Sequence, residues 1–359
     1  MKGNQLGFAI VAVIALGACG EDRRPPSECG MPNEIWKPLK SPEFVIRQAV
    51  FLNEDLYLAN GIWGVSVQQP AFCGAWSNLG LRFRQWQFSD DGSLGVQAIL
   101  PADAVLLAGI RSLRPDTTTL FRRSLIGDGP WIASDAGIDR NVLAIAESGA
   151  STYVAGDFHG IYLSEDLGLS WRQVARILVW TVLFSTTEDH LFAGGKQADL
   201  DMDPYLSHSV DGGRTWVEID LTGKLLPGRQ EGMTSLTTRV RDGLEIVMAA
   251  SGFVYVSRDL GGSFSPVLGL RTEGHLLLNP GPPFDCVVLA DSLYHTTSFE
   301  EPWQVVPLPG QGGKGGVVDW ESRNLVVIAR QGQDDEVFSA NLDDLLNRTA
   351  SALTDHRFE

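Results

Sequence analysis

Short runs of alternating apolar and polar residues fill most of the chain, with the period of two that is typical of β-strands with one buried face. The only stretch with a helical pattern is short, near residues 342–350. Ahead of Trp171 and again ahead of Trp216 lie three such runs, which predict three strands before each aromatic residue. The runs are "VLAIAE" (142–147), "TYVAG" (152–156) and "GIYLS" (160–164), then "TVLFS" (181–185), "HLFAGG" (190–195) and "PYLSHS" (204–209).

An eight-residue pattern, S-x-D-x-G-x-[S/T]-[W/F], occurs three times. It stands at residues 164–171, 209–216 and 257–264, and its Asp positions are 45 and 48 residues apart. A period near 45 residues that carries a turn signal indicates a repeat architecture. The pattern residues are Ser164, Asp166, Gly168 and Trp171, then Ser209, Asp211, Gly213 and Trp216, and finally Ser257, Asp259, Gly261 and Phe264.

Each copy of this pattern is expected to be a hairpin turn between two antiparallel strands. Asp and Ser side chains cap turns, and Gly takes the left-handed backbone conformation without strain. An aromatic residue then opens the second strand. Because the carboxylate recurs in every unit, a structural role is expected for Asp166, Asp211 and Asp259, since a catalytic carboxylate is needed only once or twice.

Large aromatic residues extend the repeat along the chain. One large aromatic residue recurs at intervals of 39 to 50 residues: Trp36, Trp86, Trp131, Trp171, Trp216, Phe264 and Trp303. Four strands per interval predict an all-β, seven-bladed β-propeller over residues 31–345, with the aromatic residues packed between blades. Three runs without a fourth follow Trp303, so the N-terminal strand "EIWKPL" (34–39) is expected to complete the last blade. Residues 346–359 then form a C-terminal tail.

The repeated pattern resembles the Asp-box, or bacterial neuraminidase repeat, of sialidase-like β-propellers. That group includes sialidases, sortilin-type receptors, some endoglucanases and photosystem II assembly-factor propellers. The resemblance implies the propeller fold. It does not imply one activity, because unrelated functions share this scaffold.

A sialidase-like activity would need further residues that the family uses: an arginine triad, an early Arg-Ile-Pro motif, a Tyr–Glu pair and an acidic Asp. Arg47 in "FVIRQAV" has no following Pro, and Arg239 and Arg241 are equally compatible with surface charges. No triad can be assigned and no catalytic residue is named. A non-catalytic binding or assembly module for a protein or glycan is therefore the main hypothesis, with a diverged glycoside hydrolase as the alternative.

The N-terminus predicts export. One Lys is followed by 13 apolar or small residues, Leu6 to Ala18, too few to span a bilayer and typical of a signal peptide. The segment ends in Leu16-Gly17-Ala18-Cys19, which looks like a bacterial lipobox. Residues 1–18 are then a signal peptide, Cys19 is lipidated, and residues 19–30 form a tether. The alternative is an ordinary signal cut near Ala18. By resemblance to Gram-negative sorting, Gly20 favours the outer membrane.

The net charge limits the partners that the protein can bind, and the cysteines predict one disulfide and one free thiol. The net charge of −16 repels nucleic acid and anionic lipid headgroups. A monomer held to the membrane by its lipid anchor is expected. In an oxidising compartment Cys29 and Cys73 fall on neighbouring blades and on one face, which predicts a disulfide that pins the closure. Cys286 in "DCVVLAD" is expected to be a buried free thiol.

Candidate ligand chemistry is sparse. Asp199, Asp201 and Asp203 alternate in a loop between the second and third strands of the fourth blade. Such a loop can bind Ca²⁺ or is simply a solvated acidic loop. "QGQDDE" (331–336) is expected to be the matching loop of the seventh blade. Phe158, Arg111 and Arg114 are candidate contacts on the same face. "GQGGKG" (310–315) precedes a strand, so it is interpreted as a loop and not a phosphate site.

Overall fold

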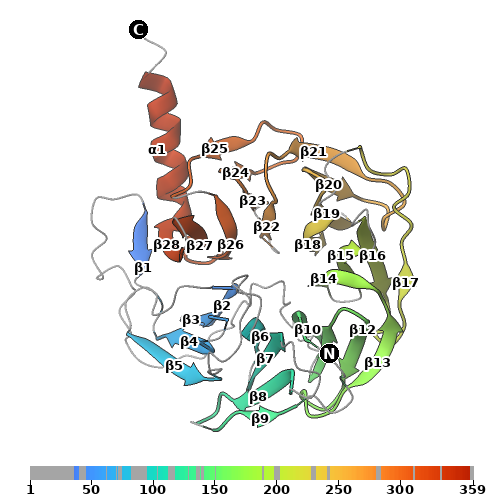
Figure 1. Ribbon diagram of the computed structural model, residues 1–359. Helices are drawn as coiled ribbons and strands as arrows, with labels where there is room; N and C mark the ends of the chain where they lie inside the picture. The colour runs from blue at the N-terminus through green and yellow to red at the C-terminus, as the bar shows by residue number, and fades with distance from the viewer. Residues whose placement is uncertain are drawn as a thin grey trace, which may run out of the picture.

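The chain folds into a seven-bladed β-propeller, as the sequence predicts (Figure 1). Every blade is a four-stranded antiparallel sheet, and the strands are ordered from the axis outward. The computed structural model describes residues 36–39, 46–61, 63–69, 71, 75–81, 95–102, 104–111, 118–127, 129–134, 138, 141–149, 151–187, 190–197, 203–227, 232–240, 243–279, 284–309, 312–331 and 334–355. Among these residues no helix is both long and apolar enough to cross a bilayer.

The first four blades follow one another along the chain. Blade 1 holds β2 (Gln48–Leu52), β3 (Asp55–Ala59), β4 (Val65–Gln68) and β5 (Trp76–Gly80). Blade 2 holds β6 (Gly95–Ala102), β7 (Val105–Arg111), β8 (Leu120–Ser124) and β9 (Ile132–Ala133). Blade 3 holds β10 (Ala144–Gly149), β11 (Thr152–Gly156), β12 (Gly160–Ser164) and β13 (Arg172–Arg176). Blade 4 holds β14 (Val179–Thr186), β15 (Leu191–Gln197), β16 (Pro204–Ser209) and β17 (Val217–Glu218).

The last three blades close the ring. Blade 5 holds β18 (Met233–Val240), β19 (Leu244–Ala250), β20 (Phe253–Ser257) and β21 (Ser265–Gly269). Blade 6 holds β22 (His275–Leu278), β23 (Cys286–Leu289), β24 (Leu293–Thr296) and β25 (Gln304–Val306). Blade 7 holds β26 (Gly313–Asp319), β27 (Asn324–Gln331), β28 (Asp334–Asn341) and, as its outer strand, β1 (Lys37–Leu39).

The closure predicted from the strand count is confirmed. β1 pairs with β28 in the register Lys37↔Ser339, Pro38↔Phe338 and Leu39↔Val337. Pro38 lies in the outermost strand, where its missing N–H costs no ladder bond. The inner strands β26 and β2 lie against each other, so the ring has no open inner edge.

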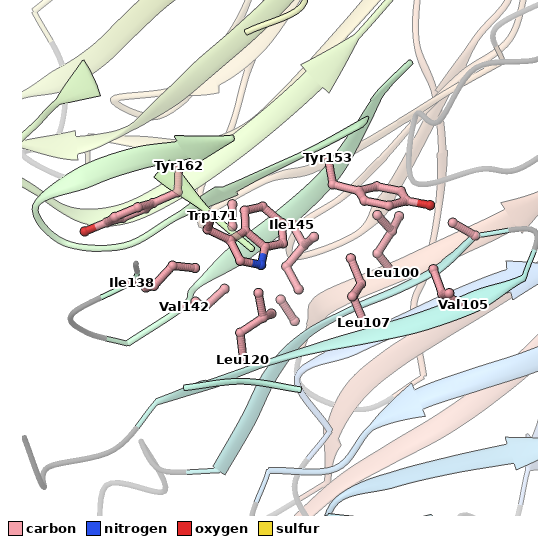
Figure 2. Close-up of a cluster of buried hydrophobic side chains, with 13 residues drawn as sticks. Leu100, Val105, Leu107, Leu120, Ile138, Val142, Ile145, Tyr153, Tyr162 and Trp171 are labelled. Atoms are coloured by element: carbon pink, nitrogen blue, oxygen red, sulfur yellow. The ribbon is translucent and has the colours of Figure 1, made fainter. Parts of the chain in front are cut away.

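Seven apolar clusters hold the ring together, and each lies between two neighbouring blades. One aromatic residue from the turn or outer strand of a blade joins each cluster. Figure 2 shows Trp171 of blade 3 among Leu107 and Leu120 of blade 2 and Ile145 of its own blade. The corresponding residues of the other clusters are Trp36, Trp76, Trp131, Trp216, Phe264 and Trp303.

Blade 1 corrects one part of the sequence analysis. Its outer strand β5 begins at Trp76, ten residues before Trp86, and Trp76 is the residue that packs between blades 7 and 1. Trp86 lies outside the described residues. Spacing alone favoured Trp86 because nearly equal intervals between aromatic residues were expected, whereas Trp76 stands 55 residues before Trp131.

The C-terminal segment is a helix, α1 (Leu342–Asp355), longer than the one expected near residues 342–350. Asn341 caps it, since its Oδ1 accepts the N–H groups of Asp343 and Asp344. Leu342 and Leu345 are buried in the cluster between blades 6 and 7. The boundary expected after residue 345 therefore falls inside a helix whose first turn packs on the propeller.

The two faces of the ring differ in which turns they carry. In every antiparallel blade the turn between the third and fourth strands lies on the same side as the turn between the first and second. We call this side the motif-turn face, because residues 164–171, 209–216 and 257–264 lie on it. The opposite face carries the turns between second and third strands and the links from one blade to the next.

A test of the closure is the variant Leu39→Ala. The Leu39 side chain is buried between blades 7 and 1, so its truncation is expected to lower the free energy of unfolding by about 2–5 kcal/mol. Pro38→Ala is the matched control, because Pro38 is exposed in the same strand and its change should cost under about 0.5 kcal/mol. Urea unfolding measures both. Equal stabilities for the two variants would mean that β1 does not support the ring.

Candidate functional site

A central cavity of 320 Å³ runs along the propeller axis and is lined by the inner strands of all seven blades. Small residues such as Ala49, Ala98, Ala144 and Gly315 stand where these strands converge. Their small side chains leave room on the axis that larger residues would fill. The cavity reaches from Lys314, near the start of β26, to Trp320, directly after the end of that strand. Lys314 therefore marks the opposite face and Trp320 the motif-turn face.

The cavity lining mixes apolar and polar residues. Blades 3 and 4 contribute mainly apolar residues, among them Leu143, Val182 and Phe184. The other blades contribute leucines such as Leu236 and Leu276 together with polar or cationic residues, which are Arg47, Gln48, Gln97, Thr234, Ser235, His275 and Lys314. The described lining residues include no Asp or Glu. A site of this kind offers hydrogen-bond donors and apolar surface together, the combination found in binding pockets.

Several of these polar groups are held in place by neighbouring blades. Gln48 Oε1 of blade 1 accepts the N–H of Ile99 in blade 2 at 2.7 Å, and Ser235 Oγ accepts the N–H of Leu276 at 2.9 Å. Lys314 Nζ donates to the carboxylate of the buried Asp335. The polar residues of the cavity lining thus hold positions that depend on the closed ring.

His275 is expected to be neutral in this setting. Burial lowers its pKa, and the nearby Lys196 lowers it further, against an opposite effect from Glu273. Lys196 and Glu273 form an ion pair of 2.7 Å close by. A neutral imidazole can both donate and accept a hydrogen bond, so His275 adds a versatile polar contact to the cavity.

Two expectations about the opposite face are corrected near blade 7. Gly313, Lys314 and Gly315 belong to the inner strand β26, so this part of "GQGGKG" is strand and not loop. Asp334, Asp335 and Glu336 open β28 and are not a free acidic loop. Sequence reasoning missed Lys314 and Asp335 as a pair because they are 21 residues apart and only the β26–β27–β28 sheet brings them together.

The acidic loop of blade 4 is described only at its end. Asp203 is exposed, and its carbonyl accepts the N–H of Gln197 at 2.8 Å. Asp199 and Asp201 lie outside the described residues, as do Arg114, Cys19, Cys29 and Cys73. Within the described part of the chain, no three His, Cys, Asp or Glu residues come close enough to hold a metal ion.

The fold brings one pair of the other candidate residues together and separates another pair. Arg111 stacks over the ring of Phe158 at 5.4 Å, which links blades 2 and 3 on the opposite face. Arg47 lines the cavity, whereas Arg239 is buried, pairs with Glu245 at 2.7 Å and stacks on Phe284. Arg241 is not among the described residues. Arg47 and Arg239 therefore do not meet at one site.

A second hollow of 490 Å³ lies at blade 3 on the opposite face, beside Asp157, Tyr162 and Arg176. The Asp157 carboxylate accepts the N–H groups of His159 and Gly160, each at 2.7 Å, and the Tyr162 hydroxyl at 3.2 Å. Burial raises the pKa of Asp157, and these hydrogen bonds counteract the rise. This carboxylate is engaged by its own loop, so the hollow is a weaker candidate than the central cavity.

The cysteine of the sixth blade is a buried free thiol in β23. Burial raises the pKa of Cys286 far above its usual range. The thiol is therefore neutral and packed in the cluster between blades 5 and 6, which gives it no reactive role.

The three motif turns share one hydrogen-bond pattern. In the turn of blade 4, Asp211 Oδ1 accepts the N–H groups of Arg214 and Thr215 at 3.0 and 2.9 Å. The Thr215 hydroxyl donates to the other carboxylate oxygen at 2.7 Å, and Ser209 Oγ accepts the N–H of Gly213 at 3.0 Å. Asp166 and Asp259 accept the N–H of the matching Ser170 and Ser263, each at 2.9 Å.

Each motif turn also packs closely against the preceding blade. The glycines Gly168, Gly213 and Gly261 have φ of +76°, +85° and +86°. A Cβ there would lie 2.9 Å from Leu107, Val154 and Ile219 respectively, each from the blade before or its link. Only glycine satisfies both the backbone angle and the close approach. The motif therefore shapes a turn and seats it on its neighbour.

This geometry generates a stability prediction for Asp211→Ala. The change removes the carboxylate that orders the turn, and its expected cost is about 1–2 kcal/mol of unfolding free energy. Binding at the opposite face should persist. Asp220→Ala is the control, since Asp220 is an exposed carboxylate that is hydrogen-bonded by the neighbouring Thr222. A loss of binding with an unchanged melting temperature would instead assign Asp211 to a functional site.

The same carboxylate should make stability depend on pH. Burial alone would raise the pKa of Asp211, but the hydrogen bonds from Thr215, Ser209 and Arg214 outweigh it and lower the pKa to about 2. The stabilisation is therefore complete above the ordinary pKa of 3.8 and is lost as the pH falls towards 2. Unfolding measured between pH 6 and pH 2 should show the difference between wild type and Asp211→Asn shrinking only below about pH 4. A constant difference would contradict this.

Comparisons with known proteins establish the fold and no family. No family model matches the chain, and no curated protein matches it. A chain of the mitotic checkpoint complex superposes with a TM-score of 0.64 at 12% identity, covering 91% of this chain and 98% of that one. A structure titled YCF48 bound to D1 peptide gives 0.59 at 12% identity, covering 86% and 96%.

A glycoside hydrolase is also similar in fold. The GH74 xyloglucanase from Xanthomonas campestris superposes with a TM-score of 0.60 at 13% identity, over 86% of this chain. This chain spans about half of the enzyme's length, 54%. Propellers of proteins that bind partners and propellers of glycosidases are thus both similar to this one. At these identities the likeness concerns architecture alone.

Proposed function

We propose that this protein is an exported, lipid-anchored propeller that binds a protein or glycan ligand and does not transform it. The ligand site is the opening of the central cavity on the opposite face. The observation that supports this is the lining of the cavity, which combines apolar residues such as Val182 and Leu276 with amide, hydroxyl and cationic groups. Such a lining orients a ligand through hydrogen bonds and contact area.

The alternative, a sialidase-like glycoside hydrolase, is favoured by the GH74 neighbour. Glycoside hydrolysis ordinarily uses two carboxyl groups on either side of the scissile bond. The described cavity lining supplies none, and Asp335 is buried and bound to the lining residue Lys314. Binding is therefore the better proposal for this cavity.

The lipid anchor rests on the sequence around Cys19 and places the protein at the bacterial cell envelope, with the outer membrane favoured. A Ca²⁺ site at Asp199, Asp201 and Asp203 stays a secondary proposal, since carboxylates at alternate positions are suitable ligands. A disulfide between Cys29 and Cys73 likewise stays a proposal. It would tie the start of the ring to the loop between β4 and β5.

Binding and hydrolysis can be tested on one preparation. The wild-type protein is applied to a glycan array and a peptide array, and is incubated with a panel of fluorogenic glycosides. We expect selective retention on an array without glycoside hydrolysis. In the double variant Arg47→Ala/Gln97→Ala retention should fall at least tenfold, because both side chains line the cavity.

Arg172→Ala is the control for that experiment. Arg172 is an exposed cation on the motif-turn side of blade 3, so its loss should leave retention unchanged. Glycoside hydrolysis that disappears in the double variant would overturn the binding proposal. Equal retention by the double variant and wild type would remove the ligand site from the cavity.

The anchor has its own test. Cys19→Ser should move the protein from the membrane fraction to the soluble exported fraction, because the acyl chains would no longer be attached. Fractionation followed by mass spectrometry of the N-terminal peptide measures both location and modification. A variant that stays in the membrane fraction would contradict lipidation at Cys19.

A further inference from the structure

Exposed apolar side chains gather on the motif-turn face. The exposed fraction is 78% for Ile126, 50% for Leu169, 66% for Val210 and 47% for Leu260. Each lies in the turn between the third and fourth strands of its blade, and the four blades, 2 to 5, are consecutive in the ring. They form an arc of one exposed apolar side chain per blade.

The turns do not need these apolar residues for their own structure. In the motif the Ser, the Gly and the aromatic residue are packed, and Leu167, at the position of Leu260, is half-buried against the cluster between blades 2 and 3. The position of Val210 is occupied by Glu165 in blade 3 and by Arg258 in blade 5. The positions of Leu169 and Leu260 are occupied in blade 4 by Arg214 and Gly212. Other residues therefore satisfy the same turns, and the exposed Leu169, Val210 and Leu260 call for an explanation outside the turn.

The remaining exposed large apolar residues do not form a second arc within the described chain. Val240 ends the inner strand β18 on the same motif-turn face. Ile132, Val217 and Val305 lie in outer strands, while Leu178 and Leu226 lie in links between blades. The motif-turn face thus carries more of the exposed large apolar residues than any other part of the described surface. Towards the opposite face, Leu178 has a similar exposed fraction.

Charged groups beside the arc are largely paired. Glu165 accepts hydrogen bonds from Arg214 at 2.5 Å and Arg172 at 3.5 Å, and these bonds lower its pKa. Asp166 and Asp211 are bonded by the N–H groups of their own turns. Charges that are satisfied within the protein are compatible with the interfacial region of a membrane, where polar and apolar groups meet.

The chain enters the propeller on this face. β1 is an outer strand antiparallel to β28, so it begins on the motif-turn side at Trp36. Trp36 stands seventeen positions after Cys19. A flexible chain of that length has an end-to-end distance of about 20–25 Å. An acyl chain on Cys19 would therefore keep the motif-turn face close to the bilayer.

We propose that the motif-turn face docks on the membrane surface, with Ile126, Leu169, Val210 and Leu260 inserted among the lipid headgroups. This inference rests on the proposed anchor at Cys19. The tether raises the effective concentration of the face at the bilayer, so a few apolar contacts suffice to orient the ring. Docking turns the cavity opening on the opposite face away from the membrane, towards ligands.

Photo-crosslinking in the cells that make the full-length protein tests the orientation. Benzoylphenylalanine replaces Leu169, Val210 or Leu260 in turn, and mass spectrometry of the irradiated protein detects lipid adducts. We expect adduct yields several-fold higher at these positions than at Leu178 or Val305. Those two control positions are comparably exposed, at 62% and 47%, but lie in a blade link and within an outer strand.

A second variant keeps the test independent of local effects of the probe. With benzoylphenylalanine at Ile126, the change Leu169→Ser/Val210→Ser/Leu260→Ser should reduce the lipid adducts several-fold, while thermal unfolding stays close to the parent. Unchanged adducts would overturn the role of the arc.

The outcomes separate docking from anchoring. Equal lipid adducts on all positions of a membrane-bound protein would overturn docking and leave the anchor intact. Crosslinks to another protein, or to a second copy of this chain, would assign the arc to that partner and overturn the proposal. Unaltered membrane association of Cys19→Ser would instead refute the anchor, and the adducts would then report on docking alone.

Discussion

The aromatic residue at each blade junction is the contact on which the rest of this structure depends. A single four-stranded sheet has two apolar faces and cannot bury either by itself, so each blade is stable only against its two neighbours. Trp171 shows how this is achieved, because it leaves the turn of blade 3 and fills the space against Leu107 and Leu120 of blade 2. Trp131 and Trp303 add a hydrogen bond, since their indole N–H groups donate to carbonyls of the preceding blade, Leu79 and Val267, at 2.7 and 3.1 Å. The repeat is therefore a device for joining blades as much as for making turns.

The closure of the ring depends on the same packing between neighbouring blades. A chain of seven blades that ended after β28 would leave one blade without an outer strand and one aromatic position empty, and β1 with Trp36 supplies both. The residues that line the central cavity come from all seven inner strands, so their relative positions are fixed only when the ring is complete. The beginning of the chain thus controls the geometry of a site to which it contributes no described lining residue.

The fold could be predicted from the sequence because its signals are local and repeated. Turn residues, alternation and aromatic spacing each occur within one blade, and seven blades reinforce the count. One junction differs: Trp86 has the expected spacing, but Trp76 at the start of β5 fills the space between blades 7 and 1. The cavity was not predictable in the same way. Sheet pairing brings Lys314 to Asp335, and contact between blades brings Gln48 to the N–H of Ile99. No local sequence pattern predicts either of these pairs.

The two faces differ in the polar groups that they leave for a ligand, and the structure of the motif turn explains this difference. On the motif-turn face the Asp and Ser side chains use their hydrogen-bonding capacity on the backbone of their own turns, so those positions have little left for a ligand. The outward positions between them are free to vary, and there the chain places Leu169, Val210 and Leu260. On the opposite face polar residues such as Gln97 and His275 line the cavity instead. One face therefore has the motif turns with an apolar arc, and the other has varied hydrogen-bonding groups. A protein tethered from the first face and binding at the second makes use of both.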